Sequence, residues 1–218
     1  MAFLMPAFIH IDNQPVPRED RGGPNVLIMC PTRELALQID EEVKKYEYKG
    51  IKSVCLYGGG DRKKQMSVVT KGVQIIIATP GRLNDLVESN VVCVESVTYL
   101  VLDEADRMLD MGFEREMDEC LQLIKKRCPE KFTKEANLFH SDTIKINFVS
   151  ATLSPKIEQL GSKLMKEYVK VGFKEGEADK QEKQEDYIGS IPQQVKQFWV
   201  EVPAQYRLLY LLVFLYCH

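Results

Sequence analysis

The stretch Thr98-Tyr-Leu-Val-Leu-Asp-Glu-Ala-Asp106 decides the fold class of this 218-residue chain. Its first five residues are apolar or branched, a composition typical of a β-strand that is buried on both faces. Its last four residues are acidic apart from Ala105, so the chain becomes polar where the strand ends. The stretch predicts a buried strand that carries polar groups at its carboxyl end.

Four further apolar runs have the same character and are predicted to be strands: Val26–Cys30, Ser53–Tyr57, Val73–Ala78 and Ile144–Val149. Helices are predicted over Met1–Ile11, Glu34–Lys45, Asp61–Thr70, Arg82–Glu88, Phe113–Lys126 and Ser154–Leu164. Strands that alternate with helices predict an α/β fold of three layers, in which helices flank a parallel sheet. Ligands of such sheets bind beyond the carboxyl ends of the strands.

Composition and charge narrow the class of protein. The chain is 44% hydrophobic and 28% charged with a net charge of -3, which argues against a broadly basic nucleic-acid binder but allows a local basic groove. No two of the six cysteines have C-x-x-C spacing, and no signal peptide is evident, so an intracellular, reducing location is expected. The apolar run Leu208–Cys217 is shorter than the ~20 residues that span a bilayer, so no membrane partner is expected.

The acidic residues after the strand at 98–102 suggest metal and phosphate chemistry. Nucleoside-triphosphate hydrolases hold magnesium beside the phosphates with an acidic residue at the end of a buried strand. A second carboxylate beside it can orient and deprotonate the attacking water. Taken alone, Asp103, Glu104 and Asp106 are more simply explained as the acidic first turn of a helix.

Two hydroxyl-bearing motifs follow other predicted strands. Ser150-Ala-Thr152 comes directly after the run at 144–149 and could simply cap the helix that begins near Pro155. Pro31-Thr-Arg-Glu-Leu-Ala36 follows the first strand and opens a helix. There Thr32 and the free backbone N–H groups of the first turn can hold a nucleic-acid phosphate, whereas Arg33 could reach that phosphate or form a local salt bridge.

Two glycine-containing motifs complete the set. Tyr57-Gly-Gly-Gly60 follows the second strand, where glycines allow a ligand to approach the backbone closely, although a lone glycine run is more often only a loop. Thr79-Pro-Gly-Arg82 follows the third strand and again opens a helix. Five consecutive strands therefore end in elements suited to contact with phosphate or metal.

In this order and at about these intervals, P-T-R-E-L-A, G-G, T-P-G-R, D-E-A-D and S-A-T resemble the motifs of the DEAD-box family of ATP-dependent RNA helicases. Leu109-Asp-Met-Gly-Phe113 is also typical of that family. The resemblance covers about residues 1–171. It implies a RecA-like lobe, the first of two that hold ATP between them and bind single-stranded RNA.

The resemblance also implies roles for individual residues. Asp103 would hold Mg²⁺ and, with Glu104, line the ATP site; Glu104 would be the general base. Asp106 would connect the nucleotide site to Ser150 and Thr152, which would couple hydrolysis to strand separation. The RNA backbone would be contacted, largely independently of sequence, by Pro31, Thr32, Arg33, Gly58, Gly59, Thr79, Pro80, Gly81 and Arg82. Ribonucleoprotein partners, in the nucleus, the nucleolus or the cytoplasm, would fit such a role.

The sequence departs from the family pattern in two motifs: the adenine-reading segment centred on a Gln and the phosphate-binding loop are both missing. Nothing in it matches the phosphate-binding loop G-x-x-x-x-G-K-[ST], so the sheet is expected to lack the strand of that loop and to leave Ile144–Val149 at an edge. The expected organisation is an incomplete first lobe over 1–172, a charged linker over 173–190, and the first strand and helix of a second lobe over 191–218. Two functions stay open: an RNA helicase whose activity this stretch alone lacks, or a catalytically silent lobe that binds RNA or a partner.

Overall fold

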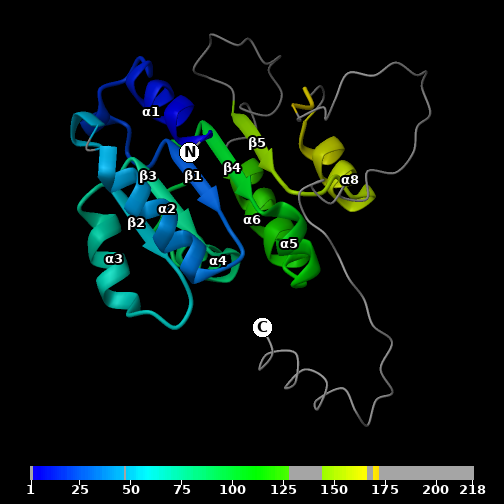
Figure 1. Ribbon diagram of the computed structural model, residues 1–218. Coiled ribbons are helices and arrows are strands. Elements are labelled where there is room, and N and C mark those ends of the chain that lie inside the picture. Colours follow the sequence, from blue (N-terminus) through cyan, green and yellow to red (C-terminus); the bar gives the residue numbers. More distant parts are fainter. Residues whose placement is uncertain (1, 47, 128–143, 166–168, 172–218) are drawn as a thin grey trace, which may run out of the picture. The chain divides into compact units, whose positions relative to one another are not determined.

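The computed structural model of the chain describes residues 2–46, 48–127, 144–165 and 169–171 (Figure 1). The predicted linker over 173–190 and the predicted start of a second lobe over 191–218 lie outside the described residues. The first predicted domain can therefore be compared with the structure, and the two later segments stay predictions.

The sheet has five parallel strands. They are β1 (Val26–Met29), β2 (Ser53–Leu56), β3 (Ile75–Ala78), β4 (Tyr99–Asp103) and β5 (Lys145–Val149). Their spatial order is β2-β3-β1-β4-β5, and each neighbouring pair is parallel. The parallel sheet predicted from the alternating sequence is confirmed, and all five predicted strands are present.

Helices connect the strands and cover both faces of the sheet. They are α1 (Leu4–Asp12), α2 (Arg33–Tyr46), α3 (Arg62–Thr70), α4 (Pro80–Glu88), α5 (Ala105–Asp110), α6 (Glu114–Arg127) and α8 (Pro155–Leu164), with short 3-10 turns at Arg18–Asp20 and Tyr48–Gly50. Six of these helices correspond to predicted segments. The sequence interpretation did not include α5.

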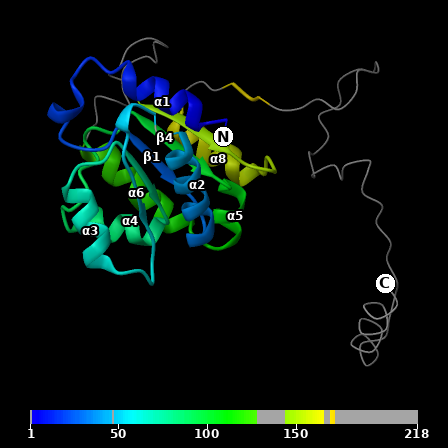
Figure 2. The ribbon, with the colours of Figure 1, turned by 60° about the vertical axis from the view of Figure 1, so that its left-hand side comes forward.

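Two apolar clusters lie between the sheet and the helices on its two faces. The described residues therefore form three layers, a sheet between two layers of helices, which Figure 2 shows from a second side. Side chains of α1 and α2 pack against one face of the sheet, together with alternate residues such as Val26 and Ile28 of β1. The other residues of β1, Leu27 and Met29, face α4, α5, α6 and α8. This alternation arises because successive side chains of a strand point to opposite faces.

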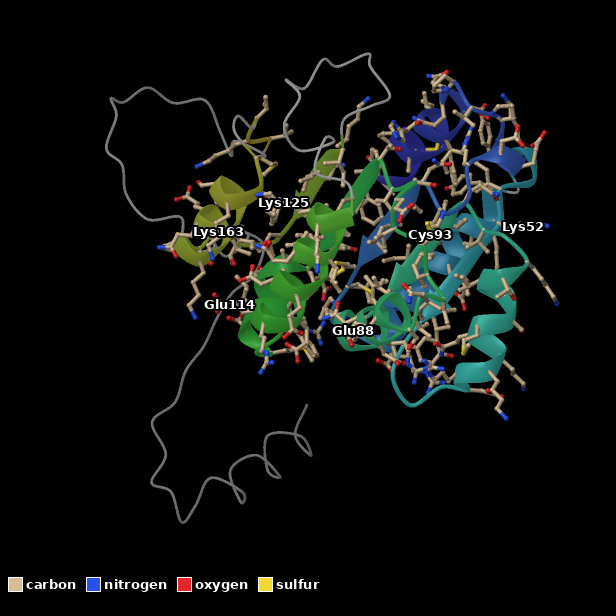
Figure 3. The ribbon with its side chains drawn as sticks, turned by 180° about the vertical axis from the view of Figure 1, so that it is seen from behind. Lys52, Glu88, Cys93, Glu114, Lys125 and Lys163 are labelled. Carbon is tan, nitrogen blue, oxygen red and sulfur yellow. The ribbon has the colours of Figure 1, made fainter. Side chains whose placement is uncertain are left out.

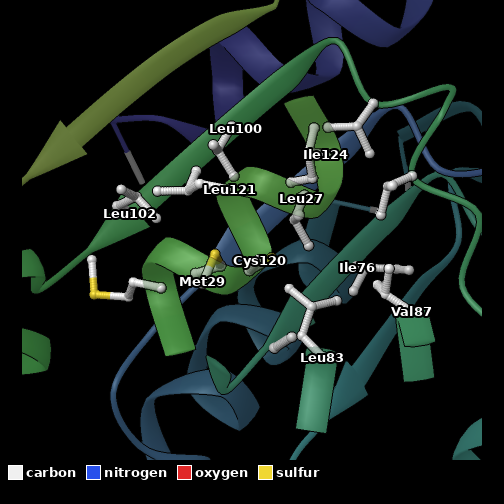
Figure 4. Close-up of a cluster of buried hydrophobic side chains, with 14 of the residues drawn as sticks. Leu27, Met29, Ile76, Leu83, Val87, Leu100, Leu102, Cys120, Leu121 and Ile124 are labelled. Carbon is white, nitrogen blue, oxygen red and sulfur yellow. The ribbon is translucent and has the colours of Figure 1, made fainter. Parts of the chain in front are cut away.

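The larger cluster lies between the sheet and helices α4 and α6 (Figure 4), and side chains of α8 also belong to it. Ile76 of β3 and Leu100 of β4 are completely buried there, beside Leu83 of α4 and Leu121 of α6. Burial of one such aliphatic side chain stabilises the fold by about 1.5–3 kcal/mol. The central strands are thus held from both faces, which fixes the positions of the loops that follow them.

Figure 3 shows the helical layer on this face from behind, with α6 running from Glu114 toward Lys125. Helix α8 lies beside α6, and Nζ of Lys163 is 4.0 Å from a carboxylate oxygen of Asp118. This contact is an exposed ion pair, which contributes at most ~1 kcal/mol. The apolar residues Ile157 and Leu160 of α8, which are buried in the larger cluster, hold the helix more strongly.

Strand β5 differs from the central strands because β4 is its one neighbour in the described sheet. The expectation that Ile144–Val149 lies at an edge is confirmed. Ile146 and Phe148 pack against the larger cluster but stay partly exposed. The sheet therefore has a firm centre, in which the strands are buried, and a loose edge, the partly exposed strand β5. In the described part of the chain, no helix combines the length and the apolar character that crossing a bilayer requires.

Candidate functional site

All five motifs predicted from the sequence follow the carboxyl ends of the strands. Because the strands are parallel, these ends point the same way and form one edge of the sheet, the carboxyl edge, which crosses all five strands and is not the edge strand β5. Along that edge the motifs follow the spatial order of the strands. The glycine run lies beside Thr79–Arg82, then come Pro31–Arg33, Asp103–Asp106 and Ser150–Thr152. The glycine, proline and arginine motifs thus occupy one half of the edge and the acidic and hydroxyl motifs the other.

Asp103 is the last residue of β4, and one of its carboxylate oxygens accepts a hydrogen bond of 3.1 Å from the backbone N–H of Glu104. Burial at the end of the strand raises the pKa of Asp103, and the neighbouring charge of Glu104 acts in the same direction. Burial destabilises the ionised form of such a carboxyl group, and a bound cation stabilises that form. This environment suits a metal ligand.

Glu104 adopts a left-handed backbone conformation, with φ 49° and ψ 49°, at the N-cap position of α5. Its side chain makes no capping hydrogen bond to the helix, so the simple capping explanation of the acidic motif does not hold for this residue. One of its carboxylate oxygens lies 3.0 Å from Nη1 of Arg107, and both side chains are well exposed. Exposed ion pairs contribute at most ~1 kcal/mol, so Arg107 orients Glu104 without locking it.

Asp106 joins the acidic motif to the hydroxyl motif. Its Oδ2 accepts hydrogen bonds from the backbone N–H of Thr152 at 3.0 Å and from the Thr152 hydroxyl at 2.8 Å. Burial alone would raise the pKa of Asp106, but the bonds from Thr152, the Arg107 N–H and Ser150 outweigh it and lower that pKa. The predicted connection between Asp106 and Thr152 therefore has a direct geometric basis.

The alternative role of Ser150 and Thr152 as caps of the following helix is wrong. Helix α8 is capped by Ser154, whose hydroxyl oxygen accepts a bond of 3.4 Å from the N–H of Ile157. The Ser150 hydroxyl instead donates to the backbone carbonyl of Thr152 at 2.7 Å. This bond shapes the turn that presents Thr152 to Asp106.

The described residues contain no group of three or more His, Cys, Asp or Glu side chains that could hold a metal ion by themselves. Mg²⁺ is commonly bound through one or two carboxylates together with water and substrate phosphates, rather than by a cage of protein ligands. A single partly buried carboxylate at Asp103 fits that manner of binding. The donor set thus suits Mg²⁺ that arrives with a nucleotide.

In the loop after β1, Thr32 has a structural role of its own. Its hydroxyl oxygen accepts a bond of 3.2 Å from the N–H of Leu35 and so caps α2, while its own proton stays available to a ligand. Pro31 is buried, whereas Arg33 is exposed with its guanidinium 4.8 Å from the ring centroid of Tyr57. This cation–π contact connects the loop after β1 with the loop after β2.

The glycine run contains two kinds of glycine. Gly58 and Gly59 are exposed, and a Cβ atom added to either would meet no atom within 4 Å, so their backbone is open to a ligand. Gly59 also has φ +75°, which favours glycine. At Gly60 an added Cβ atom would lie 2.6 Å from Nε2 of Gln65 and 2.7 Å from the ring of Tyr57. A larger residue at position 60 would therefore force the side chain of Gln65 or of Tyr57 to shift.

The loop after β3 combines a buried anchor with exposed backbone. Thr79 is the N-cap of α4, and Pro80 is buried at its first position. Gly81 is exposed with open space around it. Arg82 is only 14% exposed, and its Nη1 donates a hydrogen bond of 3.1 Å to Oε1 of Gln65. Arg82 is therefore held in place by contacts within the folded chain.

The sequence interpretation did not identify the contacts that fasten these loops together. Gln65 bridges Arg82 and the carbonyl of Tyr57, and the guanidinium of Arg62 makes two bonds of 3.0 Å to the carboxylate of Asp85. The available signal was the spacing of Arg62 and Gln65, three residues apart on α3, which matches that of Arg82 and Asp85 on α4. Residues three apart lie on one face of a helix.

Known proteins resemble this chain in sequence. Residues 1–160 match the family described as DEAD/DEAH box helicase. The probable ATP-dependent RNA helicase DDX43 of Homo sapiens is 57% identical over 121 residues, which are 56% of this chain and 19% of that protein. DEAD-box ATP-dependent RNA helicase 20 of Oryza sativa subsp. japonica is 42% identical over 172 residues, 78% of this chain and 31% of that protein. The chain thus spans less than a third of either relative.

Solved structures resemble it as well. The yeast DEAD-box splicing factor Prp28 superposes with a TM-score of 0.63 and 30% identity, over 75% of this chain and 36% of that one. The DEAD-box helicase Mss116 bound to single-stranded RNA and UDP-BeF gives a TM-score of 0.62 and 37% identity, over 75% and 32%. The fold is thus RecA-like, as predicted. Since the family match extends over residues 1–160 of 218 and the motifs meet at one edge of the sheet, the chain belongs to the DEAD/DEAH box helicase family.

Proposed function

We propose that this chain supplies part of the first ATPase lobe of an ATP-dependent RNA helicase, which unwinds RNA or remodels ribonucleoprotein as ATP is hydrolysed. The observation that carries the proposal is the pair of hydrogen bonds from Thr152 to Asp106, which connects the acidic end of β4 to the turn after β5. The loops proposed to bind RNA lie on the same edge of the sheet.

In this proposal Asp103 and Glu104 act on the phosphates and on water. Mg²⁺, held by Asp103 together with the phosphates, would neutralise negative charge as the terminal phosphate leaves. The Glu104 carboxylate orients the attacking water and accepts its proton. The exposed pairing with Arg107 is weak enough for Glu104 to turn toward that water.

Coupling between the two activities is assigned to Asp106, Ser150 and Thr152. A change at the acidic end of β4 is transmitted to the turn after β5 because Oδ2 of Asp106 holds both the N–H and the hydroxyl of Thr152. That turn leads into α8, which packs against α5 and the larger apolar cluster. A displacement at the nucleotide would therefore shift a helix rather than a single side chain.

RNA binding is assigned to the backbone and arginines of the other half of the edge. The exposed glycines Gly58, Gly59 and Gly81, with the guanidinium groups of Arg33 and Arg82, suit phosphate oxygens. Contacts to phosphate and sugar carry no sequence information, so binding is expected to be largely independent of RNA sequence. Ribonucleoprotein in the nucleus, the nucleolus or the cytoplasm would offer such RNA.

The test uses a hybrid protein. Residues 1–171 of this chain replace the matching segment of a helicase that has known RNA-stimulated ATPase activity. The hybrid should hydrolyse ATP in response to RNA. Glu104→Gln in the hybrid should lower turnover by about 10²–10⁴-fold, because the amide cannot accept the proton of water. Nucleotide binding should persist. Glu88→Gln, the same change at the exposed end of α4, should leave turnover unchanged. Undiminished turnover of Glu104→Gln would remove Glu104 from the role of base.

A second function, that of a catalytically silent RNA-binding lobe, is favoured by one observation. The 218 residues contain no G-x-x-x-x-G-K-[ST] loop, whose backbone and lysine grip the phosphates in related hydrolases. Equilibrium binding to the unaltered chain separates the two functions. Binding of single-stranded RNA without binding of ATP would favour the silent lobe for this stretch, whereas RNA-stimulated phosphate release would exclude it.

A further inference from the structure

The three loops proposed to bind RNA are fastened to one another through α3, a helix that none of the predicted motifs includes. Gln65 of α3 is only 8% exposed, although it carries a polar side chain. Its Nε2 donates to the backbone carbonyl of Tyr57 at 3.1 Å, and its Oε1 accepts from Nη1 of Arg82 at 3.1 Å. One amide therefore connects the loop after β2 with the loop after β3.

Two further contacts extend this connection. Gly60 packs so closely against Gln65 and the ring of Tyr57 that a methyl group there would overlap both. The ring of Tyr57 also contacts Arg33, whose guanidinium lies over the ring; Arg33 belongs to the loop after β1. The chain of contacts thus runs from Arg82 through Gln65 and Tyr57 to Arg33 and includes all three loops.

A neighbouring ion pair fixes the two helices that carry these groups. Arg62, one turn before Gln65, donates from Nε and Nη2 to the two carboxylate oxygens of Asp85, each at 3.0 Å. Asp85 also lies 3.7 Å from Nε of Arg82. Arg82 is therefore held from α3 and from its own helix α4. Within the described residues no hydrogen bond engages its Nη2, which is left for a phosphate oxygen.

We propose that Gln65 is a positioning residue of the RNA site, which holds Arg82 and the glycine loop in their binding geometry before RNA arrives. This inference rests on the proposed RNA-binding function. The physical reason is preorganisation: a side chain and a loop that are already ordered lose less conformational entropy when the ligand binds. Gln65 itself is buried, so this role requires no contact between its side chain and RNA.

The first experiment measures binding of fluorescein-labelled single-stranded oligouridine to the full 218-residue chain by anisotropy over a range of salt concentrations. Gln65→Met preserves size but removes both hydrogen bonds. Its affinity should fall roughly tenfold, as expected for the loss of a hydrogen bond to a charged group. If Arg82 leaves its phosphate, the slope of log K against log[salt] should become shallower by about 0.7, the value for one phosphate of a single strand.

Two controls separate positioning from loss of stability. Val69→Ala removes apolar packing against the larger cluster one turn further along α3, so it should lower the Tm but keep the RNA affinity and the salt slope. Gln38→Met makes the same chemical change on the exposed side of α2 and should alter neither the RNA affinity nor the salt slope. Gln65→Glu keeps an acceptor for Arg82 but places a carboxylate beside its guanidinium. Because that carboxylate competes with the RNA phosphate for Arg82, the salt slope of this variant should also become shallower.

A second experiment needs no RNA. The amide of Thr79 bonds to the carbonyl of Leu56 at 2.9 Å, between the two loops that Gln65 connects. Its hydrogen exchange relative to that of Ile77, in the middle of β3, should be about tenfold faster in Gln65→Met, corresponding to one lost hydrogen bond. The ratio should not change in Val69→Ala, which weakens the sheet as a whole.

The outcomes can be told apart. Wild-type affinity and slope in Gln65→Met, or an equal loss of affinity in Val69→Ala, would overturn the positioning role. If the wild-type chain fails to bind oligouridine, the proposed RNA-binding function fails, and the exchange ratio alone decides whether Gln65 fastens the loops. An unchanged ratio in Gln65→Met would then overturn the inference as well.

Discussion

The two halves of the carboxyl edge are built differently. The half formed by β2, β3 and β1 is joined by hydrogen bonds, a close glycine contact and a cation–π contact between side chains of different loops. Its central strands β1 and β3 are completely buried. In the half formed by β4 and β5, the motifs are joined through Asp106 and Thr152, and β5 is partly exposed along its length.

This difference separates a half whose loops are joined by several side-chain contacts from a half that ends in a partly exposed edge strand. Regions with few buried apolar contacts open at a lower free energy than the core. We predict that the half proposed to bind RNA is the more rigid of the two, whereas the half proposed to act on the nucleotide opens at a lower free energy. The following predictions test this comparison.

The largest effect is expected from removing apolar side chains at matched positions of the two halves. Ile76→Ala in β3 should lower the free energy of unfolding by about 2–5 kcal/mol, because its side chain is completely buried. Ile146→Ala in β5 should cost less than half as much, since that residue is partly exposed. Urea unfolding followed by circular dichroism measures both. Equal losses would remove the distinction between a firm centre and a loose edge.

A smaller effect is expected within the glycine run. Gly60→Ala should lower the free energy of unfolding by about 1–3 kcal/mol, because its methyl group would overlap Gln65 and Tyr57. Gly58→Ala is the matched control: its methyl group would enter open space, so the change should stay within about 0.5 kcal/mol. Thermal unfolding of the two variants compares them. A harmless Gly60→Ala would mean that the rigid half tolerates more movement than its contacts suggest.

Loss of the Asp106 carboxylate should have a still smaller effect on global stability. Asp106→Ala removes the acceptor of two bonds from Thr152, whose exposed groups can turn to water, so the cost should be about 0.5–1.5 kcal/mol. Exchange of the Thr152 amide should accelerate while that of Val101 in β4 stays constant. Because its hydrogen bonds lower the pKa of Asp106, the connection should be intact above its ordinary pKa of 3.8 and weaken as the pH falls below it.

The smallest contribution to the free energy of unfolding at neutral pH is expected from the protonation of His10. This residue lies at the opposite end of β4, with its Nε2 2.8 Å from the hydroxyl of Thr98. Burial, together with the charges of Lys145 and Arg21, lowers the pKa of His10 from 6.5 to about 4. The unfolded chain therefore binds the proton first, and stability should decline as the pH falls from 6.5 toward 4. His10→Gln should flatten this part of the profile. A profile that keeps its slope in the variant would assign it to another group.

Much of the fold could be predicted because its signals are local. The five apolar runs became strands within one or two residues of their predicted ends, since buried parallel strands require continuous apolar sequence. The spatial order β2-β3-β1-β4-β5 could not be obtained this way, because it depends on which strands pair across long connections. Helix α5 was missed because it is only six residues long and directly follows the acidic motif.

The candidate site was predictable where the chemistry follows a strand directly. Asp103 and Thr152 come immediately after apolar runs, so their place at the ligand-binding edge followed from the topology of parallel sheets. Gln65 had no such signal, because it lies within a helix, where a glutamine is usually exposed. Its importance depends on Tyr57 and Arg82, which only the folded chain brings to it.

The left-handed backbone of Glu104 has a consequence for protein engineering. A side chain in that conformation costs roughly 1–2 kcal/mol, which glycine would not incur. A selection for thermal stability alone would therefore favour Glu104→Gly and produce a hardier protein without its proposed base. A library screened for heat resistance should enrich glycine at this position, whereas a library of the hybrid screened for RNA-stimulated turnover should retain glutamate there. The two results together would show that this lobe gives up stability for its proposed chemistry.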